Sequence, residues 1–203
     1  MKGLLLKDIY TVVGNMRAFL VLIIIFSIVP NMPISPFAMI YAAMLPINAL
    51  AWDEQSKWNN LADMMPYSKF QLVFTKYLFG YICLFCAALL SAIFAFVGYA
   101  LPFVNVDLTD ALLTSAASLI AGLILMNVNL PLMFRLGVEK GRLVFGLITG
   151  GFMLLYVMGL GAVEDLDMGY VPVALVGGIA AAVAVILSVI SVLLSMKWYG
   201  KNN

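Results

Sequence analysis

The stretch AFLVLIIIFSIVPNMPISPFAMIYAAMLPINALAW, residues 18–52, decides how many times this chain crosses a membrane. It carries no charged residue, but prolines interrupt its middle at residues 30–36. A helix needs ~20 apolar residues to cross the hydrocarbon of a bilayer. The stretch is therefore either one long span or a hairpin of two short spans that turns at the prolines.

The rest of the chain is equally apolar. Hydrophobic residues make up 65% of the 203 positions, charged residues make up 10%, and the mean hydropathy is +1.09. Few soluble domains can bury so much apolar surface, so we expect lipid to cover much of it. Four further apolar runs are long enough to span, at residues 78–103, 111–134, 143–162 and 173–196.

The distribution of charge selects the hairpin, because lysine and arginine concentrate on the cytoplasmic side of membrane proteins. With two spans in residues 18–52, all 11 basic residues fall on one side. A single span would place the groups around Lys2 and Lys57 on opposite sides. We therefore predict an all-α protein with six membrane spans, a single transmembrane domain over residues 1–203, and both termini in the cytoplasm. The opposite side receives Asp107, Asp110, Glu164, Asp165 and Asp167.

The first 16 residues predict an amphipathic helix that lies in the plane of the membrane surface. Lys2, Lys7 and Asp8 are expected to stay in water. The apolar stripe has helical spacing and consists of Leu4, Leu5, Ile9, Val12 and Val13.

A polar segment at residues 53–68 separates the second and third spans. Trp58, Leu61, Ala62 and Met65 recur at i, i+3, i+4 and i+7, which predicts a short amphipathic helix. We expect Asp53 to cap its start and Pro66 to end it. The third span then begins with a capping box. The two residues of that box are Ser68 and Gln71.

This segment has two interpretations. It is either a solvated connector or a docking helix for a soluble partner, and its position and internal structure favour docking.

Several classes of function are excluded or disfavoured. The chain has no histidine and no GxxxxGK[ST] phosphate-binding loop, so it lacks the residues of His-dependent catalysis and of an ATPase. No basic run points to nucleic acid. Cys83 and Cys86 lie in an apolar run, where thiols behave as small hydrophobic groups. The predicted spans hold no carboxylate, which argues against proton-coupled transport and places the energy source on another subunit.

A few residues within the spans are candidates for a translocation path or a hinge. The favoured role of the amides is hydrogen bonding between helices. A proline inside a helix bends it. The candidates are Asn48, Asn127, Asn129 and Pro131. Close helix packing is predicted at Gly146, Gly150, Gly177 and Ala181.

Four segments together carry a family resemblance. They are KGLLLKD at residues 2–8, the acidic pair Asp53 and Glu54 with Trp58, MPYSKFQLVFTKY at residues 65–77, and PLMFRLGVEKGR at residues 131–142. In this order the chain resembles the permease subunits of ABC-2 type transporters, and within them the small six-span bacterial branch similar to exporters of peptide toxins and bacteriocins. The resemblance covers nearly the whole chain. Met65 departs from it, because leucine is usual there.

The resemblance implies a bacterial cell-membrane permease that binds no cofactor itself. Two permease subunits would pair, as a homodimer or with a paralogue, and form a path for amphipathic peptides or other hydrophobic compounds. Each would engage a separate cytoplasmic ATP-binding subunit, which holds the ATP and Mg²⁺. The amphipathic helix near the N-terminus, at residues 4–16, would help form the docking face. The implied contacts are Trp58, Leu61, Met65 and Pro66, with Asp53, Glu54 and Lys57 as a polar rim.

Two other functions stay open. The chain could be the substrate-capture subunit of a vitamin or metal importer, although its first span lacks the small-residue face by which such subunits dock. It could also be a non-transporting membrane protein, such as an immunity or assembly factor.

Overall fold

The computed structural model describes residues 2–27, 35–100, 108–137, 140–141, 143–151, 154 and 173–199. Within these residues every regular element is a helix. Residues 140–141, 143–151 and 154 are also helical. The helices are α1 (Lys2–Asn15), α2 (Arg17–Ser27), α3 (Ser35–Gln55), α4 (Trp58–Asp63), α5 (Lys69–Ala100), α6 (Leu108–Leu136) and α8 (Val173–Tyr199).

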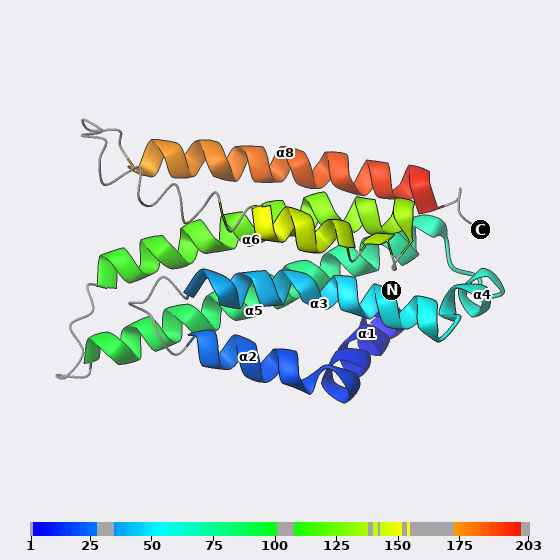
Figure 1. Ribbon diagram of the computed structural model, residues 1–203, viewed down its shortest axis with the longest axis horizontal. Helices are drawn as coiled ribbons and strands as arrows, with labels where there is room; N and C mark the ends of the chain where they lie inside the picture. Colours follow the sequence, from blue (N-terminus) through cyan, green and yellow to red (C-terminus); the bar gives the residue numbers. More distant parts are fainter. Residues whose placement is uncertain are drawn as a thin grey trace.

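The long helices form a bundle along one axis, and α4 lies at one end of it (Figure 1). Helix α3 occupies the centre, in contact with α2, α5 and α6, and α8 packs on the outer side of α6. Helices α2 and α3 run side by side in opposite directions, as the hairpin prediction requires (Figure 1). Helix α1 departs from α2 at an angle of 82°.

Three of the described helices are long and apolar enough to cross a membrane: α5, α6 and Gly177–Tyr199 of α8. The bent pair α1–α2 is a fourth candidate if it counts as one broken span. The described part of the chain is therefore all-helical, and the protein is a multi-pass membrane protein. The count of six spans stays a prediction, and much of the predicted fifth span, residues 143–162, lies outside the described residues.

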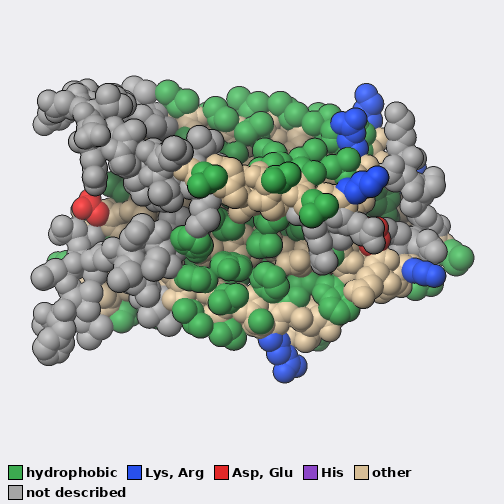
Figure 2. Space-filling view, in the orientation of Figure 1, with side chains coloured by type: hydrophobic (Ala, Val, Ile, Leu, Met, Phe, Trp, Pro, Cys, Tyr) green, Lys and Arg blue, Asp and Glu red, His purple; other side chains and the backbone are tan. Residues whose placement is uncertain are grey.

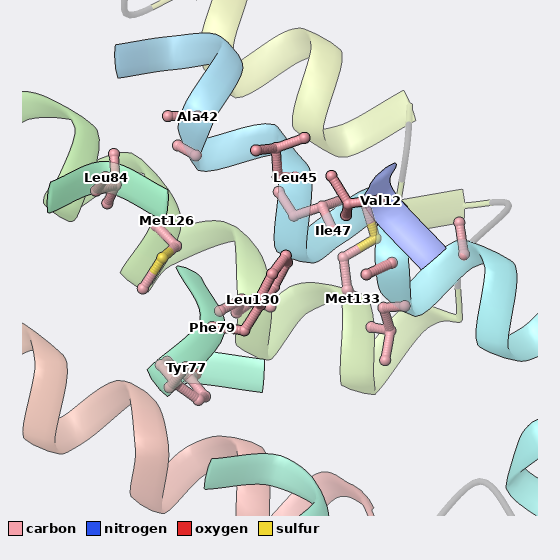
Figure 3. Packing of buried hydrophobic residues seen from close by; sticks show 14 of the residues in the cluster. Val12, Ala42, Leu45, Ile47, Tyr77, Phe79, Leu84, Met126, Leu130 and Met133 are labelled. Carbon is pink, nitrogen blue, oxygen red and sulfur yellow. The ribbon is translucent and has the colours of Figure 1, made fainter. Parts of the chain in front are cut away.

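Small residues bring the central helices together. Ala38, Ala42 and Ala49 of α3 are fully buried. A Cβ atom on Gly80 of α5 would lie 3.0 Å from the Pro46 ring and would overlap the Met126 sulfur. Such close backbone approach is how membrane helices gain van der Waals contact. Figure 3 shows the resulting core, which includes Leu45, Leu84, Met126 and Leu130.

The packing glycines differ from those predicted. Gly146, Gly150 and Gly177 have no described atom within 4 Å of an added Cβ, so the prediction that they mediate close packing is wrong for the described contacts of one chain. Ala181 is likewise exposed. Spacing within one helix shows which residues are small but not which face meets a neighbour. Close approaches are instead found at Gly80, at Gly122, where an added Cβ would lie 2.9 Å from Leu84 Cδ2, and at Gly141, where it would overlap the Met133 sulfur.

Charge is confined mostly to the ends of the bundle. In Figure 2 most of the lysine and arginine side chains gather at the end that holds α4 and the last turn of α8, whereas the sides are apolar. Helix α5 is about 48 Å long at 1.5 Å per residue, well beyond the ~30 Å of hydrocarbon. It is therefore longer than one crossing of the hydrocarbon needs, and its first turns carry Lys69 and Lys76.

Candidate functional site

The connection between α3 and α4 is a tight reversal. Helix α3 continues through Asp53 and Glu54 to Gln55, and the Ser56 amide still donates to the Trp52 carbonyl at 2.9 Å. Lys57 then adopts a left-handed backbone conformation, with φ 55° and ψ 30°, and immediately precedes α4. The prediction that Asp53 caps this helix is wrong, because α3 runs past Asp53 and its carboxylate is engaged elsewhere.

The connection between α4 and α5 follows the sequence more closely. Helix α4 ends at Asp63, and a turn that includes Pro66 leads to α5. The Gln71 amide donates to Ser68 Oγ and the Ser68 amide donates to Gln71 Oε1, both at 3.3 Å. The capping box is therefore confirmed. The helix within residues 53–68 is shorter than predicted. Residues 53–55 belong to α3, and residues 64–68 form the connection to α5.

Apolar residues of α4 and of the turn that follows it differ in exposure. Ala62 is 1% exposed, whereas Leu61 is 51%, Met64 84% and Met65 39% exposed. Pro66 is exposed beside them. Met64 was missed by the helical pattern because it lies outside the spacing of Leu61 and Met65. We call Leu61, Met64, Met65 and Pro66 the α4 patch.

Four ionisable side chains close into a ring under α4. Lys7 Nζ lies 2.6 Å from Asp53 Oδ1 and 3.2 Å from Asp8 Oδ1. Lys76 Nζ lies 2.7 Å from Asp8 Oδ1 and 2.6 Å from Asp53 Oδ2. Each lysine therefore contacts both aspartates, and the ring joins α1, α3 and α5. We call these four residues the charge ring.

The charge ring is largely withdrawn from water. The side chains of Asp8, Asp53 and Lys76 are 2%, 7% and 8% exposed, and that of Lys7 is 24% exposed. The prediction that Asp8 stays in water is therefore wrong. Asp53 is buried as well, and its place in a polar docking rim stays a prediction. Apolar side chains line the cavity of about 20 Å³ beside the ring. They include Leu4, Leu50, Leu72 and Phe134.

Trp58 connects α4 to the charge ring. The Lys7 ammonium lies 4.5 Å from the centre of the Trp58 ring, within the range of a cation–π interaction. Trp58 is half-buried, whereas Glu54 and Lys57 are exposed. Trp58 thus attaches α4 to the bundle, which differs from the predicted role of a partner contact.

A second polar cluster holds α8 against α5 and α6. The Tyr77 hydroxyl lies 2.6 Å from Ser191 Oγ and 2.7 Å from Ser195 Oγ. Asn127 Nδ2 donates to Ser188 Oγ at 2.8 Å, and its Oδ1 accepts from Tyr81 at 3.1 Å. Asn127 therefore bonds between helices, which confirms the favoured interpretation of this amide.

The other path candidates make none of the hydrogen bonds of this cluster that are described above. Asn129 Nδ2 donates to the Leu125 carbonyl of its own helix at 2.8 Å. Pro131 is buried within α6. Asn48 Nδ2 is buried and has no hydrogen-bond partner among the described atoms. The described hydrogen bonds thus do not join the four candidates, and their role in a path or hinge stays a prediction.

Comparison with known families is decisive. A family model described as "ABC-2 family transporter protein" matches residues 3–200. The chain belongs to the ABC-2 transporter family. No curated protein and no solved structure matches it.

ABC-2 membership makes this chain a membrane permease, a transport component that is not itself catalytic. Permeases of this family generally work with a cytoplasmic ATP-binding subunit. In the part of this ABC-2 protein that the structure describes, no group of three or more metal-binding side chains is present, and Cys83 and Cys86 are free.

Proposed function

We propose that this chain is the permease subunit of an ATP-driven exporter, and that a cytoplasmic ATP-binding subunit docks on the α4 patch. One observation carries the proposal. At the charged end of an ABC-2 permease, the short helix α4 and the turn that follows it present Leu61, Met64 and Met65 to solvent.

The position of the patch explains why a protein partner is expected there. Exposed apolar side chains on the sides of the bundle are covered by lipid. The α4 patch lies beyond that apolar belt, at the end where lysine and arginine gather (Figure 2). Contiguous apolar surface in water marks an interaction site. Methionine side chains are flexible and polarisable, which suits a surface that must fit a moving partner.

Transport itself follows from the family. Two permease subunits, identical or paralogous, would form the path at their interface, and closure of the ATP-binding subunits would push on α4. Amphipathic peptides and other hydrophobic compounds are the proposed cargo, because the small bacterial exporters that the sequence resembles carry them. The protein would act in the bacterial cell membrane.

The test is capture of the ATP-binding subunit from native membranes in mild detergent, with mass spectrometry of the bound proteins. We expect an ATPase with a phosphate-binding loop. Met64→Asp should reduce its recovery at least about tenfold, since a charge buried in an apolar contact without a partner costs well over 1.4 kcal/mol. Leu61→Asp should act in the same way.

The matched control is Thr109→Asp, which adds the same charge at an exposed position at the opposite end of the bundle. It should capture as much ATPase as the unaltered protein. Equal capture by Met64→Asp and Leu61→Asp would refute docking on α4. No ATPase with the unaltered protein, while the permease stays dimeric, would favour a non-transporting immunity or assembly factor instead.

A further inference from the structure

The charge ring differs from an ordinary surface ion pair in its closure. Two positive and two negative charges alternate, so that its net charge is zero. Three of its four side chains are less than 10% exposed. The ring joins segments far apart in the chain, since Lys7 and Asp53 are 46 residues apart and Asp8 and Lys76 are 68 apart.

Stability alone explains such a ring poorly. Moving charges out of water costs several kcal/mol per ion, and well-packed apolar residues in place of a buried ion pair are often as stable or more so. Ionic contacts do fix geometry, because each ion pair is most favourable at one short distance between the ammonium of Lys7 or Lys76 and an aspartate carboxylate. The ring is therefore expected to hold another part of the molecule in place.

The part that the ring holds in place is α4, which contacts the ring through Trp58. Lys7 belongs to the charge ring and also lies under the indole of Trp58, the first residue of α4. An apolar side chain could fill the place of Lys7, but it could not offer a cation to the ring face of Trp58. The charge ring thus sets the place of Lys7, and Lys7 sets the place of α4.

We propose that the charge ring is the joint that positions the docking helix α4 on α1, α3 and α5, with Lys7 and Asp53 as its positioning residues. This rests on the proposed function only in naming α4 as the docking helix. A push on α4 would pass through Trp58 and Lys7 to Asp53 at the end of α3, and through Asp53 to Lys76 on α5. The central helix and a membrane-crossing helix would then move with α4.

The ring offers two matched double variants. Lys76→Met with Asp8→Leu leaves the neutral pair Lys7–Asp53 and the Lys7–Trp58 contact. Lys7→Met with Asp53→Leu leaves the neutral pair Lys76–Asp8 but removes the cation from Trp58. Each variant deletes one positive and one negative charge, so neither leaves an unpaired buried charge. Only the second should release α4.

The measurement is hydrogen exchange of residues 57–66 in the purified full-length protein in lipid nanodiscs. For Lys7→Met with Asp53→Leu we expect exchange about tenfold faster than in the unaltered protein, because local opening now needs no broken cation–π contact or ion pair. Lys76→Met with Asp8→Leu should remain within about twofold of the unaltered protein by the same reasoning.

Two further variants separate positioning from general damage. Lys7→Arg keeps the cation and should restore protection of α4, because guanidinium also stacks on tryptophan. Lys69→Met removes an exposed lysine from the same helix as Lys76 and should change nothing. Exchange in residues 111–120, at the far end of the bundle, reports whether the fold is intact.

Unchanged protection of α4 in Lys7→Met with Asp53→Leu would overturn the proposal. Equal release by both double variants would overturn it as well, because the Trp58 contact would then not be the link. The measurement needs no partner protein, so its result stands whether or not an ATP-binding subunit is captured on the α4 patch.

Discussion

At the scale of residues, the spacing of residues within one helix does not predict which charged side chains are buried. Asp8 was expected in water because it lies outside the apolar stripe of its helix, and Asp53 was expected to cap the docking helix. Both are buried instead, and their partners Lys7 and Lys76 make that burial tolerable. Lys76 comes from a helix that begins after the connection, so no periodicity within α1 or α3 contains it.

The glycines supply a residue-scale prediction. Gly80→Ala and Gly122→Ala should each destabilise the protein by about 1–3 kcal/mol, because the added Cβ meets Pro46 or Leu84 at 2.9–3.0 Å. Gly146→Ala should be neutral or slightly stabilising, because nothing described lies within 4 Å and alanine favours the helix. The three variants are compared by their midpoints of thermal unfolding in detergent, monitored by size-exclusion chromatography. Equal midpoints would contradict the close packing of α3, α5 and α6.

At the scale of elements, helix ends decide where the polar segment goes. The break after Asn15 turns α1 by 82° from α2, so α1 can lie along the membrane surface while α2 enters it. Lys57 in a left-handed conformation ends the α3 connection, and the Ser68–Gln71 box starts α5. The last two features set α4 apart as a separate short helix at the end of the bundle.

The capping box gives the prediction at this scale. Ser68→Ala removes the acceptor of the Gln71 amide and should cost about 0.5–2 kcal/mol of local stability. Hydrogen exchange at residues 69–72 should rise, while the rest of α5 stays protected. Ser56→Ala, at an exposed serine outside the box, is the control. If both variants exchange alike, the box does not hold the start of α5.

At the scale of the whole molecule, the bundle is polarised. The apolar sides suit lipid, and one end gathers most of the basic side chains together with α4 (Figure 2). Helix α1 begins and α8 ends at that same end (Figure 1). The positive-inside rule predicts that this end faces the cytoplasm, where an ATP-binding subunit would meet the α4 patch.

Orientation can be measured with single cysteines in a background that lacks Cys83 and Cys86. A membrane-impermeant thiol reagent should label Thr109→Cys on intact cells and Met64→Cys only in inverted vesicles. Both positions are exposed, so accessibility depends on the side of the membrane alone. The reverse pattern would place α4 outside the cell and would remove the docking proposal.

The sequence by itself determined the membrane class, the antiparallel pairing of the α2 and α3 segments, the capping box and the ABC-2 family. Each depends on composition, on charge summed over loops or on residues close together in the chain. Only the tertiary structure decided that Gly80 and Gly122 are among the packing glycines, that Trp58 faces Lys7, and that Lys7, Asp8, Asp53 and Lys76 form one ring. Those features depend on which helices meet, because a buried charge is tolerable only beside a partner that another helix brings to it.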